Sequence, residues 1–348
     1  MGRPLGVGSV VCAVALVVLV LPAVATAHAG RSAPVATDFE ATIRGIAPET
    51  SLVRTKVVDG DLELWLRADP SAVVEVAGIQ GEPLLLFDRR GVFINVRSLT
   101  AAADRIDPRV LQPVAGSRAS PIWHRVTTGH SFMWHEHRLH ALQPLAHGRN
   151  SSGILGRWSV PLRVDGARGT ITGVLAYAAP DAVWLWVGLA CTMALAMGGA
   201  FVPWQSSATR RAAACAAVAA TLLVCVIRIG RELYGRPGVH ALGYAEIAAT
   251  CAVGIALLYA LGRWRGEGLV VLALFVSVGS LYEALTMLPV LTHAVALSAL
   301  PSTFVRVAAV AMLGLGGGLL ALVLRAPASA LRSHSAGDHG PEPVGGAA

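Results

Sequence analysis

Six histidines crowd into one short stretch of this sequence. The chain has 11 histidines in 348 residues, and six of them lie between positions 124 and 147, namely His124, His130, His135, His137, His140 and His147. The densest part runs Trp-His-Glu-His-Arg-Leu-His from Trp134 to His140. Neutral imidazole is the commonest metal ligand in proteins, and its pKa lies near physiological pH. The stretch is therefore a metal site, a proton-sensitive site or a packed polar corner.

The spacing of these histidines argues against a zinc-protease helix and favours a strand. The helical His-Glu-x-x-His motif needs a second histidine at position 139, which is Leu139. In a strand, alternate side chains share a face, so His135 and His137 project together while His140 projects from the other face. Two imidazoles on one strand face can bind one copper or zinc ion, with His140 or His28 as a further ligand. We therefore expect a metal site built on His135 and His137.

The two charged residues of the motif have expected roles beside the metal. We expect Glu136 to accept a hydrogen bond from a ligand ring and so fix its tautomer, as carboxylates beside metal sites often do. The guanidinium of Arg138 stays charged and is expected to pair with Glu136. The alternative is a polar corner around Trp134 in a membrane-anchored interaction module, where the histidine motif is structural or forms a docking surface. No catalytic triad, phosphate loop or Cys-x-x-Cys motif is evident in the domain that carries the motif, so an enzyme is the third and least favoured of the hypotheses.

The first 27 residues have the pattern of a secretory signal peptide. A short positive region at Arg3 precedes an apolar run at positions 10–21, which is too short to span a bilayer. Small residues at positions 25 and 27 fit a cleavage site after Ala27, although a cut after Ala29 also fits. Cleavage after Ala27 makes His28 the mature N-terminus. Its α-amine and imidazole then form a chelating pair of the kind called a histidine brace when it holds copper.

Residues 28–180 are predicted to form an extracytoplasmic β domain. Positions 39–46 alternate apolar and polar residues, and Asp59-Gly60-Asp61 is a turn signal between two apolar segments. The predicted strands are 39–46, 52–58, 62–66, 73–79, 84–87, 91–95, 122–126, 132–137, 155–164 and 170–177. Short strands with regular turn signals are typical of an all-β, Ig-like sandwich. The Pro- and Ala-rich stretch 101–121 is predicted to be a surface loop.

The C-terminal half is predicted to be an all-α transmembrane domain of five helices at 181–325. The chain is 54% hydrophobic and 14% charged, well below the roughly 25% charged residues of soluble domains. Long apolar runs cover 183–202, 212–227, 241–261, 269–289 and 304–324. Arg residues are denser in the predicted inner loops, so we expect a multi-pass cell-membrane protein with a cytoplasmic, disordered tail at 326–348. The net charge of +7 is then a topology signal, and no nucleic-acid partner is expected.

Several ionisable residues lie in or beside the predicted spans. Glu246, Glu283 and Arg306 are expected to face protein or water, because a charge facing lipid is costly. They could form one buried ion-paired cluster. Arg228 and Arg231 are expected instead to mark the outer interface, where long side chains reach the headgroups. The expected partners are the lipid bilayer and a membrane or extracytoplasmic protein.

Several short motifs give the chain a family resemblance. Gly81-Glu82-Pro83, Gly91-Val92-x-x-Asn95 and Arg97-Ser98, followed by Trp134-His135-Glu136-His137-Arg138-x-His140, resemble an uncharacterised family of actinobacterial membrane proteins. That family has a signal peptide, a β ectodomain with a Trp-His-Asp/Glu-His-Arg-x-His motif, and C-terminal transmembrane helices. The chain departs from the pattern at Ala141 and at Leu99-Thr100. More loosely, the architecture is similar to that of bacterial copper-resistance and copper-import proteins.

Overall fold

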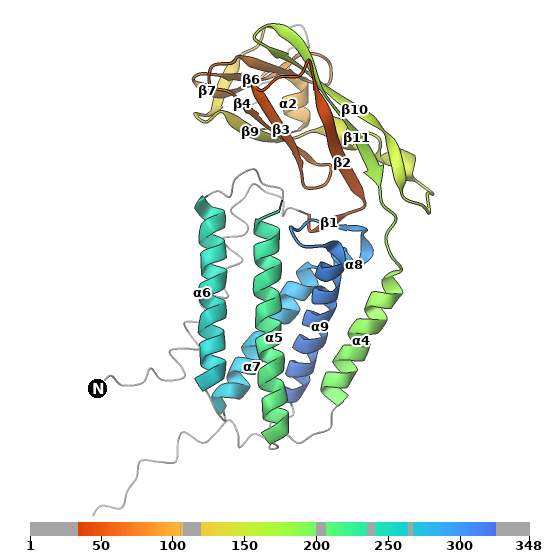
Figure 1. The fold of residues 1–348 in the computed structure, drawn as a ribbon, viewed down its shortest axis with the longest axis vertical. Helices are drawn as coiled ribbons and strands as arrows, with labels where there is room; N and C mark the ends of the chain where they lie inside the picture. Colours follow the sequence, from red (N-terminus) through yellow and green to blue (C-terminus); the bar gives the residue numbers. More distant parts are fainter. Residues whose placement is uncertain are drawn as a thin grey trace, which may run out of the picture.

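The computed structural model of this chain describes residues 34–104, 106, 120–199, 207–234, 241–263 and 267–324. Figure 1 shows a domain of β-sheets stacked on one end of a bundle of helices. The predicted signal peptide, His28 and the predicted tail lie outside the described residues. Strands come first and long helices afterwards: the long strand before the helices ends at Tyr177, and the first long helix begins at Val183.

Ten strands form the two main sheets of the β domain, and all paired neighbours are antiparallel. The larger sheet has the order β2 (Phe39–Ala47), β11 (Ala167–Tyr177), β10 (Gly153–Val164), β5 (Val74–Ala77), β6 (Pro83–Asp88), β7 (Gly91–Asn95) and β8 (Trp123–Thr127). The smaller sheet has the order β3 (Val53–Val58), β4 (Glu63–Ala68) and β9 (Ser131–His135). Each predicted strand is therefore present, but the sheets divide as seven and three strands.

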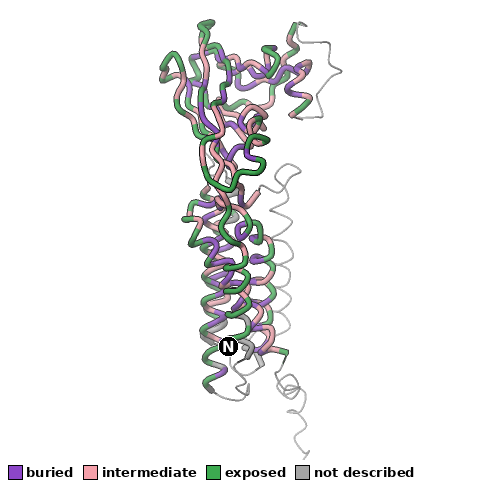
Figure 2. Tube along the Cα trace, turned by 90° about the vertical axis from the view of Figure 1, so that its right-hand side faces the viewer, coloured by how far each residue is buried: buried purple, intermediate pink, exposed green. Residues whose placement is uncertain are grey.

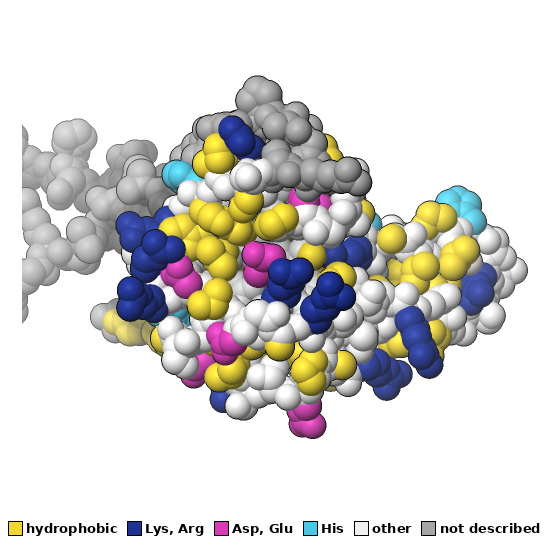
Figure 3. Space-filling model, turned by 90° about the horizontal axis from the view of Figure 1, so that it is seen from above, with side chains coloured by type: hydrophobic (Ala, Val, Ile, Leu, Met, Phe, Trp, Pro, Cys, Tyr) yellow, Lys and Arg dark blue, Asp and Glu magenta, His cyan; other side chains and the backbone are white. Residues whose placement is uncertain are grey.

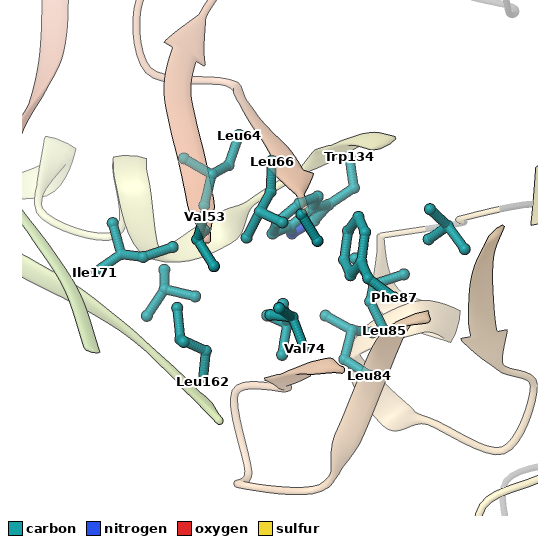
Figure 4. Packing of buried hydrophobic residues seen from close by; sticks show 14 of the residues in the cluster. Val53, Leu64, Leu66, Val74, Leu84, Leu85, Phe87, Trp134, Leu162 and Ile171 are labelled. Carbon is teal, nitrogen blue, oxygen red and sulfur yellow. The ribbon is translucent and has the colours of Figure 1, made fainter. Parts of the chain in front are cut away.

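The core of the β domain lies between the two sheets. Val53, Leu64 and Leu66 from the small sheet point toward Val74 and Leu162 from the large one (Figure 4). Along β4 the buried positions alternate with more exposed ones, because successive strand residues point to opposite faces. One face of the small sheet is consequently apolar and buried, and its other face is open to solvent. The arrangement confirms a sandwich-like β domain.

A short helix replaces the start of the predicted loop at 101–121. Helix α2 (Leu99–Ala103) begins at Ser98, whose hydroxyl accepts a hydrogen bond from the backbone N–H of Ala101 at 3.1 Å. A side-chain oxygen at this position satisfies a backbone donor that the first turn of a helix leaves free. The helix ends at Asp104, and most of the predicted loop beyond it lies outside the described residues.

The described part of each predicted apolar run is largely helical. The helices are α4 (Val183–Gly199), α5 (Ser207–Glu232), α6 (Ala241–Arg263), α7 (Glu267–Thr286) and α9 (Ser302–Leu324), which lie side by side in Figure 1. Among the described residues, two helical segments are long and apolar enough to cross a membrane, namely Arg211–Glu232 and Ser302–Leu324. Shorter apolar segments are Val183–Met193, Ile247–Tyr259 and Val270–Thr286. By length and composition the prediction of five spans is thus supported for two.

The β domain and the helices meet through a small mixed junction. Strand β1 (Ala36–Thr37) pairs antiparallel with β12 (Val295–Ala296), which follows the short helix α8 (Pro289–Thr292) between α7 and α9. The side chain of Asp38 accepts a hydrogen bond from the backbone N–H of Ala294 at 2.8 Å. Backbone pairing therefore joins two segments that lie about 260 positions apart in the sequence, Ala36–Thr37 and Val295–Ala296.

Candidate metal centre

The histidine motif lies where strand β9 turns into a single helical turn, α3 (His137–His140). Strand β9 ends at His135, and Glu136 takes an extended conformation with φ −123° as the N-cap of α3. The prediction of a strand through His137 is therefore wrong by two residues. The helical turn arises because the Glu136 carboxylate accepts a hydrogen bond from the backbone N–H of Arg138 at 3.1 Å and so starts the helix.

The residues of the motif divide cleanly into an inner and an outer set. Trp134, Glu136 and Leu139 are buried, with exposed fractions of 2% or less. His135, His137 and His140 are all partly exposed. His137 and His140 share a face because residues three apart in a helix are neighbours. A strand through this motif was predicted to place His140 on the face opposite His135, whereas in the structure the two histidines lie on the same side.

A buried ion pair between Glu136 and Arg138 holds the motif against the β domain. The Glu136 carboxylate accepts hydrogen bonds from Trp134 Nε1 at 3.0 Å and from Arg138 Nε and Nη2, both at 2.7 Å. Arg138 also donates from Nη2 to the backbone carbonyl of Ala77 on β5 at 3.1 Å. The predicted pair of Glu136 and Arg138 is confirmed. The hydrogen bonds described for Glu136 go to Trp134 and Arg138, so its role in orienting a histidine ring stays a prediction.

The three histidine rings gather around one point. One nitrogen from each of His135, His137 and His140 lies within 4.8 Å of the other two, and the ring centroids are 4.8 to 5.1 Å apart. Nitrogens bound to one tetrahedral zinc ion are about 3.3 Å apart, given a Zn–N distance of about 2.0–2.1 Å. Closing by at most about 1.5 Å is within the reach of side-chain rotation. This group could hold a metal ion.

Asp104 holds the ring of His137, and sequence reasoning did not single it out. A carboxylate oxygen of Asp104 contacts Nδ1 of His137, and the Asp104 side chain is fully buried. Burial raises the pKa of Asp104 to about 6, an effect that the nearby imidazole partly offsets. The other carboxylate oxygen, Oδ2, is buried and has no hydrogen-bond partner within the described part of the chain. Position 104 lies 33 residues before His137, so no local spacing could have predicted the contact.

His140 has a different oxygen neighbour, in the turn between β3 and β4. Its Nδ1 lies 3.3 Å from the backbone carbonyl of Asp61. The Asp61 side chain is itself buried and accepts a hydrogen bond from Gln143 Nε2 at 2.7 Å. Burial raises the pKa of Asp61, and the bond from Gln143 acts in the opposite direction. For both His137 and His140, therefore, Nδ1 faces an oxygen and Nε2 is the remaining nitrogen.

The other motifs of the family resemblance build the support for Asp104. The Glu82 carboxylate accepts hydrogen bonds from Ser98 Oγ at 2.9 Å and from the Thr100 backbone N–H at 3.0 Å, which fixes the start of α2. These bonds outweigh burial and lower the pKa of Glu82. Asn95 donates from Nδ2 to the Pro83 carbonyl at 2.8 Å. Helix α2 in turn places Asp104 at its end, beside His137.

Within the described part of the structure, Glu283 and Arg306 do not belong to one cluster. Glu283 is buried and pairs with Arg228 at 2.9 Å, with Arg231 at 4.0 Å. Arg306 is also buried but pairs with Asp181 at 2.7 Å, just after β11, and donates from Nε to the Val290 carbonyl at 3.1 Å. Arg228 and Arg231 therefore turn toward a carboxylate on α7. Glu246 lies in α6, but its side chain is outside the described part of the structure.

Comparison of the chain with protein-family models, with curated proteins and with solved structures finds no match. The resemblance to the actinobacterial membrane-protein family stays a prediction.

Proposed function

We propose that this chain is a multi-pass membrane protein whose exported β domain binds one copper or zinc ion through His135, His137 and His140. The observation that carries the proposal is the convergence of three imidazole nitrogens within 4.8 Å of one another. Imidazole is a ligand that suits both ions, and three histidines leave a further coordination position open. His28 remains a possible extra ligand outside the described residues.

The oxygen neighbours of the rings support metal binding over simple packing. Metal-ligating histidines usually donate their second ring N–H to a carboxylate or a carbonyl, which fixes the tautomer and raises the basicity of the ligand. For His137 this acceptor is the carboxylate of Asp104, and for His140 it is the backbone carbonyl of Asp61. A histidine with a purely structural role has no need for the ring nitrogens of two other histidines to lie close to its own ring. The rings of His137 and His140 each have Nδ1 beside an oxygen, which leaves Nε2 of each ring to bind a metal ion.

The surface of the helices supports a membrane location. Large apolar side chains point outward along their length, among them Trp184, Leu185, Leu195, Ile255, Tyr259, Val278, Leu285, Val307 and Leu324. Exposed positions run along the whole helical part in Figure 2. The end of the β domain seen in Figure 3 instead mixes Lys, Arg, Asp and Glu among its hydrophobic side chains. Because lipid can cover an apolar helix surface at little cost and water cannot, we propose five spans with the β domain outside.

Calorimetric titration of the full-length chain with Cu(II) and Zn(II) tests the metal site. The double variant His135→Ala/His137→Ala removes two of the three nitrogens, and we expect it to abolish binding. His124→Ala/His147→Ala is the matched control, because both histidines belong to the same histidine-rich window but are exposed and lie outside the cluster. Binding should weaken as the pH falls through about 6.5, because protonated imidazole cannot coordinate.

Two results would overturn the proposal. One is equal affinity in the wild type and in the His135→Ala/His137→Ala variant. The other is a wild-type Kd weaker than about 10 μM, equivalent to about 7 kcal/mol. The orientation has its own test in a cysteine-free background. A cysteine at His147 should react with an impermeant reagent outside intact cells and one at Arg332 should not, and the reverse pattern contradicts the topology.

A further inference from the structure

The solvent-facing side of the small sheet carries an unusual set of side chains. In the register of β3, β4 and β9, one row across this side is Arg54, Arg67 and Ser131, and the next is Lys56, Trp65 and Met133. We call these six residues the outer face. Its three cations are exposed, and Met133 is 36% exposed although it is a large apolar residue. The outer face thus combines positive charge with uncovered apolar surface.

The charges of the outer face are only partly balanced by nearby acids. Asp69, just beyond β4, has its pKa lowered by hydrogen bonds from Ser71 and in part by Arg67, and Glu63 lies two residues before Trp65 on the same side of β4. Arg54 and Arg67 lie directly opposite each other on neighbouring strands, an arrangement that destabilises a sheet. Within the described residues, none of the three cations forms a salt bridge. A second pair of opposed arginines, Arg163 and Arg168 on β10 and β11, differs because Glu75 on β5 lies opposite Arg163. With three cations against the two acids Glu63 and Asp69, this side of the small sheet keeps a net positive charge, which favours a negatively charged partner from outside the domain.

The backbone hydrogen bonds show that the β4–β9 pairs of this face bring their side chains close together. Glu136 N–H bonds to the Leu62 carbonyl and Ala68 N–H to the His130 carbonyl. Because the two kinds of pair alternate along an antiparallel ladder, the pairs on this face are the non-hydrogen-bonded ones: Glu63–His135, Trp65–Met133 and Arg67–Ser131. Side chains in such pairs are the closer ones, with Cα atoms about 4.5 Å apart. Trp65 therefore lies against Met133. The same rule places Glu63 against His135, so the outer face leads directly into the histidine cluster.

The arginine pair of the outer face lies away from the helices, whereas Lys56 lines a pocket together with Leu233 and Tyr234 at the end of the helical part. The turn between β3 and β4 is the end nearest the helices, because Gly60 lies against Thr37 and Leu297 of the junction. Arg54 and Arg67 are four residues farther along their strands than Val58 and Glu63. That is about 13 Å farther from the junction at about 3.3 Å per residue. An anionic membrane beside the helix ends is thus poorly placed to neutralise the arginine pair.

We propose that the outer face is a docking site for an acidic polypeptide segment of a partner protein. Carboxylates of the segment pair with Arg54, Lys56 and Arg67, and its apolar side chains cover Trp65 and Met133. Charge complementarity selects this occupant, and the net charge of +7 argues against a second copy of the chain. A partner docked here also lies beside the histidine cluster. The proposal does not depend on metal binding and goes beyond it.

Fluorescence anisotropy of the full-length chain in nanodiscs of neutral lipid tests the proposal. The probe is a fluorescein-labelled peptide of about 12 alternating Asp and Leu residues, long enough to cross the face as an extended segment. We expect saturable binding that weakens with rising salt, because exposed charges are screened. Arg54→Glu/Arg67→Glu should weaken it at least about tenfold. Arg163→Glu/Arg168→Glu, which changes the net charge equally, should weaken it less than about twofold.

Several results would overturn the proposal of an acidic partner segment. Absence of saturable binding to the wild type, or equal weakening by both double variants, overturns the proposal, because the peptide then senses only net charge or nothing. Two further measurements name the other occupants. If the wild type binds phosphatidylglycerol vesicles but not the peptide, and Arg54→Glu/Arg67→Glu loses vesicle binding, the outer face binds lipid instead. If the wild type sediments as a dimer and this variant does not, the outer face binds a second copy of the chain. If that variant does not fold, judged by circular dichroism, Arg54→Gln/Arg67→Gln replaces it and must weaken peptide binding by the same tenfold criterion.

Discussion

Replacing the carboxylate that holds His137 should weaken metal binding without removing a ligand. Asp104→Asn keeps the shape of a fully buried side chain that contacts Nδ1 of His137. The amide is neutral, so it can no longer favour the charge that develops on a metal-bound ring. Loss of such a partner typically costs 10- to 100-fold in metal affinity. That range corresponds to about 1.4–2.7 kcal/mol of binding free energy.

The magnitude should fall in the upper part of that range because the contact is buried. Water cannot replace a carboxylate whose side chain is 0% exposed, so the full interaction is lost. The assay is competition for Zn(II) or Cu(II) against a chelator of known affinity, at a fixed pH above 7. Asp69→Asn is the control, because its carboxylate is exposed and bonds to Ser71 instead of to a ring of the cluster. An unchanged affinity in Asp104→Asn would refute the role of Asp104 in orienting His137.

Three further predictions concern stability. Glu136→Gln should lower the free energy of unfolding by about 3–5 kcal/mol, because it leaves the Arg138 guanidinium buried without its charge partner; denaturant titration should show part of the loss restored in Glu136→Gln/Arg138→Met. Arg54→Thr should raise the free energy of unfolding by up to about 1 kcal/mol, because it relieves the opposition to Arg67, and an unchanged or lower melting temperature contradicts this. Because the folded-state pKa of Asp104 is raised from 3.8 to about 6, the native state binds the proton more tightly, so its contribution to the stability of the metal-free protein falls as the pH rises through this window. Asp104→Asn should flatten that decline, and an identical pH profile in both proteins rules out the explanation.

The main strands and the long helices of this protein could be located from the sequence alone. Alternation of apolar and polar residues at 39–46 and turn signals between the other short segments predicted the main strands, and the five apolar runs predicted the five long helices, because these signals depend only on neighbours along the chain. Local signals also sufficed for the pair of Glu136 and Arg138, which are two residues apart. The general location of the site, in the histidine-rich window, followed from composition.

Tertiary structure decided how the site is assembled. The carboxylate of Glu136 ends β9 and starts α3, and this local change of conformation moves His140 to the side of His135. Asp104 and Asp61 reach the rings from 33 and 79 positions away, and only packing of α2 and of the β3–β4 turn against the motif brings them there. Glu283 and Arg306 likewise found separate partners, Arg228 and Asp181. Sequence patterns repeat with the period of a helix or strand, whereas contacts between distant segments depend on how the whole chain packs.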